Sequence, residues 1–181
     1  MPNWCSCDLF ISGKIDEIKE FMNAVKYDDE SEFIIDHNKI IPYPKEYRDL
    51  DELVRIREFI YQELETKRLS YSDIKSKYGN ILDDGYNNGG YDWRCKTYGT
   101  KWGICDSSLE YVKKRSAKYI FSSAWEPPIP LITKMSDLFH RLEFKLRYYE
   151  SMMGFSGRFV IKNNIILENY ENNKYKGNRG G

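Results

Sequence analysis

The stretch CDLFISGKIDEIKEFMNAV, residues 7–25, contains the two elements that decide the fold. Leu9 and Ile11 occupy alternate positions before Gly13, which is a short strand pattern over residues 8–12. Beyond that break, apolar residues recur at the 3.6-residue spacing of a helix, namely Ile15, Ile18, Phe21, Met22 and Val25. The stretch therefore predicts a strand followed by an amphipathic helix.

The second half of the chain repeats this order around a hairpin. Residues 108–112 and 118–122 are strand candidates on either side of the polar turn KKRSA. After the break at WEPPIP, Pro130 suits the first turn of a helix, and residues 144–148 then alternate as a strand. The segment RFVIKNNIILEN predicts two further strands around its asparagine pair. The whole order predicts an α+β, ferredoxin-like split βαβ sandwich with an extra C-terminal β-hairpin.

A helical insertion is expected at about residues 44–90. Apolar residues at helical spacing predict a helix over about residues 50–64, and the turn-rich DDGYNNGG, residues 83–90, predicts a loop. We therefore expect one ferredoxin-like domain over residues 1–170 that carries this insertion. The polar residues 171–181 are expected to form a flexible tail.

Composition limits the partners. The 181 residues include 28 basic and 28 acidic side chains, so the formal net charge is zero. General attraction to nucleic acid or anionic lipid is not expected, and any nucleic-acid contact would depend on a local patch. No apolar run approaches the length of a membrane span, and the first residues, MPNWCSCDLF, lack the pattern of a signal peptide. We expect a cytoplasmic protein without membrane partners.

The segment YDWRCKTYGTKW, residues 91–102, is the first candidate binding motif. Tyrosine, tryptophan and arginine are enriched at protein-binding hot spots, and alternating cations and aromatics also hold unstacked bases. A buried aromatic cluster is the structural alternative. The residues on which a binding role would depend are Tyr91, Trp93, Arg94, Lys101 and Trp102.

A basic hairpin tip is the second candidate. Lys113, Lys114 and Arg115 follow the predicted strand at residues 108–112 and could add phosphate contacts to those of the aromatic segment. The alternative for this tip is a solvated turn. A glycine-aromatic signature of the kind that RNA-binding ferredoxin-like sheets carry is absent from this sequence, which weakens the nucleic-acid hypothesis.

Metal and catalytic chemistry receive little support. Cys5 and Cys7 form one C-x-C pair, whereas structural zinc sites usually combine two such pairs. On a strand both cysteines point to the same face, and small buried apolar residues explain them. His37 is a weak candidate for a catalytic acid or base, with nothing to place it near a nucleophile. We expect no metal and no cofactor, and a non-enzymatic role is favoured over an enzymatic one.

Three aromatic residues stand at expected corners of the chain. Trp4, Trp125 and Phe155 lie close to proline or glycine, and Trp125 directly precedes the segment EPPIP. Such rings can line a rigid concavity, but large rings are mostly buried, so core packing is the favoured interpretation.

Several strings resemble, in order, the YubB-type ferredoxin-like domain family of bacteriophages, prophages and plasmids. They are MPNWCSCDLFISG, HNKIIPYP, YDWRCKTYGTKW, SSAWEPPIPLI and MGFSGRFVI. Two positions depart from the family pattern, because Tyr98 stands where tryptophan is frequent and Cys7 where asparagine is usual. The resemblance implies the fold and a setting in mobile elements, and it supplies no reaction.

These observations lead to a ranked expectation of function. The first is a non-enzymatic phage or mobile-element protein that binds a host protein or protein–nucleic-acid complex, such as an inhibitor of a CRISPR nuclease. The second is an accessory protein that binds nucleic acid or nucleotide through the same motif and residues 113–115. The third is a hydrolase acting on nucleotide or nucleic acid with His37 as its base.

Overall fold

The computed structural model describes residues 3–28, 34–67, 70, 72–73, 76 and 88–173. The chain divides into two compact units. The first comprises Met1–Pro42 and Arg94–Gly181, and the second is Tyr43–Trp93. The second unit occupies the segment in which the sequence predicts a helical insertion.

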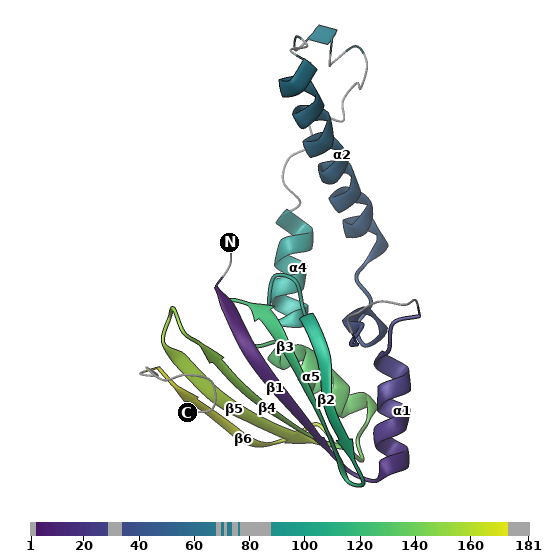
Figure 1. Ribbon diagram of the computed structural model, residues 1–181, viewed down its shortest axis with the longest axis vertical. Helices are drawn as coiled ribbons and strands as arrows, with labels where there is room; N and C mark the ends of the chain where they lie inside the picture. The colour runs from purple at the N-terminus through teal and green to yellow at the C-terminus, as the bar shows by residue number, and fades with distance from the viewer. Residues whose placement is uncertain are drawn as a thin grey trace. The chain divides into compact units, whose positions relative to one another are not determined.

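A six-stranded antiparallel sheet forms the centre of the first unit (Figure 1). The strands lie in the order β2-β3-β1-β4-β5-β6. Their bounds are β1 Trp4–Ser12, β2 Cys105–Lys113, β3 Ser116–Ala124, β4 Glu143–Glu150, β5 Phe155–Lys162 and β6 Ile165–Asn172. The order of the first four is that of a split βαβ fold, and β5 and β6 extend it. The predicted ferredoxin-like fold with an extra hairpin is confirmed.

β1 is the central strand, and it alternates strictly between the two faces of the sheet. Cys5, Cys7, Leu9 and Ile11 are completely buried on one face. β1 pairs along its length with β3 and with β4, so that Leu9 lies between Tyr119 and Leu146. Its two cysteines are buried, as the strand interpretation predicted.

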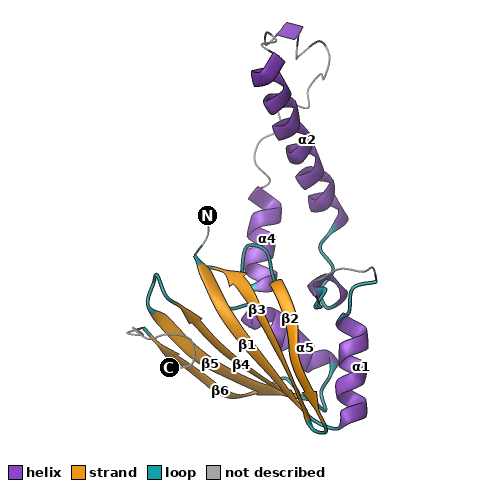
Figure 2. Cartoon of the chain, in the orientation of Figure 1, coloured by secondary structure: helices purple, strands orange, loops and turns teal. Residues whose placement is uncertain are grey.

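Two helices, α1 (Ile15–Val25) and α5 (Ile129–Leu138), pack on that buried face (Figure 2). Phe21 of α1 makes edge-to-face contacts with Tyr119 and Phe144, at centroid distances of 6.2 and 5.4 Å. In α5, Pro130 occupies the first turn, where its missing amide hydrogen is not needed. Both helices follow the apolar spacing read from the sequence.

The second unit contains the long helix α2, Lys45–Lys67. Ion pairs within the helix join Lys45 to Asp49 and Arg55 to Glu52. α4, Asn88–Tyr98, runs from this unit into the first one. The predicted loop at residues 83–90 is therefore wrong at Asn88–Gly90, and its earlier residues lie outside the described part of the chain. Within the described residues, no helix is long and apolar enough to cross a membrane.

The C-terminal hairpin turns at Asn163 and Asn164, which have φ angles of 49° and 59°. Asparagine tolerates this left-handed conformation, which two-residue turns between antiparallel strands require. β6 continues to Asn172, so the predicted tail begins later than residue 171. Residues 174–181 lie outside the described part of the chain.

Gly157 of β5 offers a test of the packing between β4, β5 and β6. A Cβ at this position would overlap the phenol ring of Tyr148 and would lie 2.6 Å from the carbonyl oxygen of Tyr170. Gly157→Ala should therefore lower the free energy of unfolding by about 1–3 kcal/mol. Urea unfolding measures this change. Ser156→Ala, on the opposite face of the same strand, is the control, and equal stability of both variants would contradict the packing.

Candidate binding surfaces

The loop after α4 is held firmly against the end of β3. Gly99 ends the helix with a φ of +80°, and a Cβ there would lie 2.5 Å from Cδ of Pro130. The Thr100 hydroxyl then donates a 2.7 Å hydrogen bond to the carbonyl oxygen of Ala124, and both residues are buried. These contacts fix the direction in which Lys101 and Trp102 leave the helix.

Three tryptophans and one lysine gather at this end of the sheet. The rings of Trp4 and Trp102 have a centroid distance of 5.8 Å and a tilt of 41°. Lys101 Nζ lies 4.8 Å from the ring centre of Trp102 and 5.4 Å from that of Trp125. We call Trp4, Lys101, Trp102 and Trp125 the tryptophan surface. Trp4 and Trp125 are 40% and 39% exposed, so the favoured interpretation as core residues is wrong for both.

The backbone of Trp125 is strained. Its φ of 66° lies in the left-handed region, which is a true outlier for so bulky a residue. The conformation is held in place because the Trp125 amide donates a 2.9 Å hydrogen bond to the carbonyl oxygen of Asn3. On the other side, the Ser123 hydroxyl donates a 2.6 Å hydrogen bond to the carbonyl oxygen of Glu126. Strain of this kind costs about 1–3 kcal/mol and clusters at functional sites.

Two methionines add apolar area at the same end of the sheet. Met152 and Met153 occupy the β4–β5 turn and are 77% and 71% exposed. Because Cys5 pairs with Glu150, this turn follows the end of β4 that lies beside the start of β1. The buried Glu150 carboxylate accepts hydrogen bonds from the amides of both methionines. Flexible exposed methionines are common at surfaces that bind proteins.

The structure divides the predicted aromatic motif. Tyr91 and Trp93 lie in α4 within the second unit and are half-buried, and the Trp93 ring lies 5.5 Å from that of Tyr43. Arg94 is also half-buried in α4 and belongs to the first unit. Lys101 and Trp102 are the members of the motif that join Trp4 and Trp125. Their juxtaposition depends on strand pairing, which the sequence pattern alone did not reveal.

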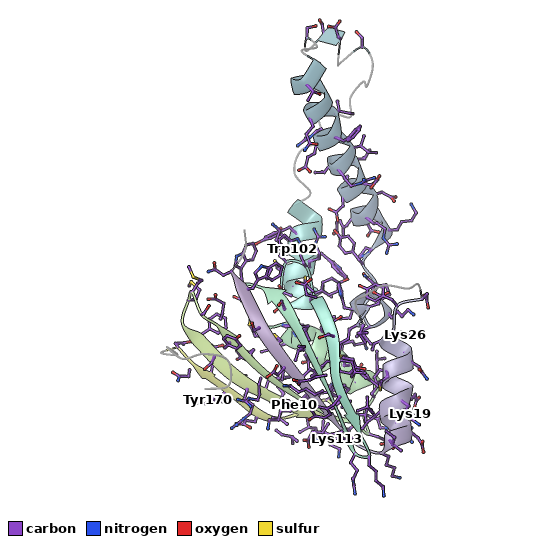
Figure 3. All side chains as sticks on the ribbon, in the orientation of Figure 1. Phe10, Lys19, Lys26, Trp102, Lys113 and Tyr170 are labelled. Carbon is purple, nitrogen blue, oxygen red and sulfur yellow. The ribbon has the colours of Figure 1, made fainter. Side chains whose placement is uncertain are left out.

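The basic hairpin tip lies far from the tryptophan surface. Lys113 ends β2, and Lys114 and Arg115 form the exposed turn to β3. β2 begins at Cys105, shortly after Trp102, so the tip is at the other end of a nine-residue strand. Figure 3 shows Trp102 and Lys113 at opposite ends of the sheet. The structure does not bring these two predicted binding groups together.

The sheet face opposite to α1 and α5 carries a third group. Phe10 lies between Lys118 and Lys145, whose Nζ atoms are 5.2 and 5.8 Å from its ring centre. Lys118 also forms ion pairs with Glu110 at 2.6 Å and with Asp8 at 3.6 Å. These carboxylates offset much of the positive charge around the ring. Phe10 carries no signal in the sequence, because its lysine neighbours come from β3 and β4.

His37 is half-buried in the short 3₁₀ helix His37–Lys39. Its ring lies edge-on to Tyr98 at 5.0 Å, and a Cβ on Gly103 would approach its Nε2 to 2.6 Å. Burial lowers the pKa of His37 below its ordinary value of 6.5, against opposing effects of Asp36 and the Ile104 backbone. Its Nδ1 is buried and has no hydrogen-bond partner in the described part of the chain. His37 thus packs against Tyr98 and Gly103 as a loop residue, and these contacts add no support to the hydrolase hypothesis.

The cysteines give no indication of metal chemistry. Cys7 Sγ lies 3.8 Å from the Ser123 hydroxyl, and burial raises the pKa of its thiol well above the ordinary value. Within the described ranges, no group of three or more histidine, cysteine, aspartate or glutamate side chains is placed to hold a metal ion.

Comparison with known proteins supports the fold. Residues 97–178 match a family model described as a ferredoxin-like domain in Api92-like protein. This part of the chain is similar to that domain. No curated protein matches the chain. A crystal structure of the protein Api92 from Yersinia pseudotuberculosis is similar over 95% of this chain and 98% of its own, with a TM-score of 0.52. Since the two sequences are 13% identical, the likeness concerns the fold alone.

The lowered pKa of His37 predicts a pH-dependent stability. Below about pH 6.5 the unfolded chain binds the proton more readily than the folded one, so stability should fall as the pH decreases through the folded pKa. His37→Gln removes this contribution. The unfolding free energy of the wild type should therefore fall more steeply between pH 7.5 and 5 than that of the variant, as urea titrations at each pH would measure.

His140→Gln provides the matched control, since it removes the exposed second histidine and leaves His37 in place. A wild-type pH profile that coincides with the His37→Gln profile would contradict the assignment.

Proposed function

We propose that this chain is a non-enzymatic binding protein that captures a protein partner on its tryptophan surface. The observation that carries the proposal is the exposure of Trp4 and Trp125 around a lysine that contacts two tryptophan rings. Tryptophan is the side chain most enriched among interface residues that dominate binding energy. Since hydrogen bonds of Thr100 and of the Trp125 amide fix the backbone that carries Trp102 and Trp125, little loop freedom is lost on binding, which favours affinity.

The chemistry of the surface indicates the kind of partner. Trp4, Trp125, Met152 and Met153 offer large apolar area, and Lys101 contributes one cation among the rings. A fitting partner presents an apolar patch with polar groups at its rim. Because the chain as a whole is neutral, long-range attraction adds little, and the affinity is expected to depend on how well the partner packs against the tryptophan rings.

The proposed biological setting, a mobile element in a bacterial host, comes from the resemblance to YubB-type proteins of phages, prophages and plasmids. On this proposal the partner is a host protein, and capture inhibits an antiviral defence such as a CRISPR nuclease. Support comes from the sequence strings that carry the resemblance and from the exposed tryptophans. Two of those strings, MPNWCSCDLFISG and SSAWEPPIPLI, contribute Trp4 and Trp125 to the surface.

Nucleic-acid binding is the second candidate function. The observation that favours it is the placement of Phe10 between Lys118 and Lys145 on the open face of the sheet, where a base could stack. Salt dependence separates the two candidates. Affinity for a single-stranded oligonucleotide should fall steeply with salt if nucleic acid is the ligand, whereas capture of a protein on an apolar surface should not.

Trp125→Gly tests the tryptophan surface without damaging the fold. Glycine adopts the left-handed conformation freely, so the lost ring contacts are offset by relief of backbone strain and stability should change little. Affinity for a host protein captured by the wild type, then purified, should fall by at least about thirtyfold, which corresponds to a hot-spot residue. Calorimetric titration measures the affinity, and thermal unfolding checks the fold.

Tyr170→Ala is the matched control, because Tyr170 is an aromatic residue 54% exposed on β6, far along the strand order from the tryptophan surface. Undiminished capture by Trp125→Gly and by a Lys101→Ala/Trp102→Ala variant would exclude the surface.

The anti-defence role has its own test. A host strain whose CRISPR nuclease targets a plasmid should accept that plasmid when the wild-type chain is expressed. Trp125→Gly should abolish this protection at equal protein level, because the surface no longer holds the nuclease. Transformation efficiency is the measurement. If the wild type gives no protection against any defence system in the host, the partner has another role.

A further inference from the structure

An open cavity of about 510 Å³ lies at the end of the sheet opposite to the tryptophan surface. It is lined by segments of the first unit only. The lining residues are Gly13, Lys14, Glu17, Arg115, His140, Arg141, Lys162 and Asn163. The volume is within the range of small-molecule sites.

Strand pairing brings four connecting segments together at this end. Ser12 pairs with Ser116 and with Glu143, and Glu143 pairs in turn with Lys162. The segments that follow or precede these residues therefore meet around one opening. Two hydrogen bonds fix them, from the Gly13 amide to the Arg115 carbonyl at 3.1 Å and from the Asn164 amide to the Ser136 hydroxyl at 3.1 Å.

The lining is strongly positive although the chain is neutral. Four cations, Lys14, Arg115, Arg141 and Lys162, face a single carboxylate, that of Glu17. That carboxylate is already engaged, because it accepts a hydrogen bond from the Lys14 amide at 3.2 Å and lies 3.4 Å from Arg141 Nε. Glu20, outside the cavity lining, lies 3.9 Å from the same guanidinium. The lining thus has three more positive than negative side chains, and Glu20 beside Arg141 and Glu143 opposite Lys162 offset part of this excess.

Phosphate is the chemistry that this arrangement fits. Phosphoryl oxygens accept several charge-assisted hydrogen bonds at once, and arginine can bind them with two parallel donors. Cations that approach from four separate segments suit a group with oxygens on several sides. Lys14, Arg115, Arg141 and Lys162 are all exposed, so the interaction is expected to be weak and sensitive to salt.

We propose that this cavity binds the phosphate groups of a nucleotide or of a phosphorylated nucleic-acid end. The proposal does not rest on protein capture at the tryptophan surface, which lies at the other end of β1. In this proposal Arg115 acts as part of a binding cavity and not as part of a free hairpin tip, because it lines the cavity together with residues from three other segments.

The decisive experiment is an NMR titration of the full-length chain with pyrophosphate at low salt. Amide signals of Gly13, Lys14 and residues 162–164 should shift, and the shifts should decrease when salt is added. Arg115→Gln/Lys162→Gln should weaken binding by at least about tenfold, because each substitution removes one charge-assisted contact. Both side chains are exposed, so thermal unfolding should show an unchanged fold.

The matched control is Lys19→Gln/Lys26→Gln, which removes the same charge from exposed positions on and just after α1 (Figure 3). Neither residue lines the cavity. It should retain binding within about twofold if only general electrostatics changes. Equal weakening by the two pairs would overturn the proposal, as would the absence of any shift with pyrophosphate, with ADP and with a 5′-phosphorylated oligonucleotide.

The last two ligands identify the source of the phosphate. Tighter binding of ADP than of pyrophosphate, lost in the Arg115→Gln/Lys162→Gln variant, supports a nucleotide. A preference for the 5′-phosphorylated oligonucleotide over the same strand with a 5′-hydroxyl supports a nucleic-acid end. Trp125→Gly should leave either affinity unchanged, which separates failure of this site from failure of protein capture.

Discussion

The structure depends on the pairing of β1 with two neighbours at once. All nine of its residues pair with β3, and eight of them pair with β4. Every second side chain of the strand is buried beneath the helices. A slip of one residue would turn Cys5, Cys7, Leu9 and Ile11 toward the open face and would bury Asp8 in their place. The register is therefore fixed by the cost of exposing apolar area and burying a charge.

That fixed register also determines where functional groups meet. Trp4 begins β1, and Gly13 and Lys14 follow its end, so the tryptophan surface and the basic cavity lie at the two ends of one rigid strand. At the rise of an extended chain the two are roughly 30 Å apart. Residues distant in sequence are brought to each end by the same ladder, such as Trp125 at one end and Lys162 at the other. A ligand at either end leaves the other accessible.

The elements could be read from the sequence where their signals are local. Leu9 and Ile11 alternate, α1 has a clear apolar spacing, and Asn163 with Asn164 marks a turn; all three were predicted.

α4 was missed because two glycines and an asparagine open it, and these residues disfavour helices in isolation. Its apolar spacing is also weak, so tertiary contacts and the Gly99 cap must support it. The sites could not be predicted in the same way, because they depend on which strand ends lie together.

Charge illustrates this limit most clearly. An equal number of acids and bases led to the expectation that phosphate would not be attracted to the molecule as a whole, and over the entire surface that argument still applies. It does not apply to one end of the sheet. Lys14, Arg115, Arg141 and Lys162 are separated by up to 148 positions in the chain, yet pairing through Ser12, Ser116 and Glu143 places them around one opening. Because the fields of exposed charges act within about 8 Å at physiological salt, we expect this local excess, rather than the net charge, to determine which ligands this end of the sheet attracts.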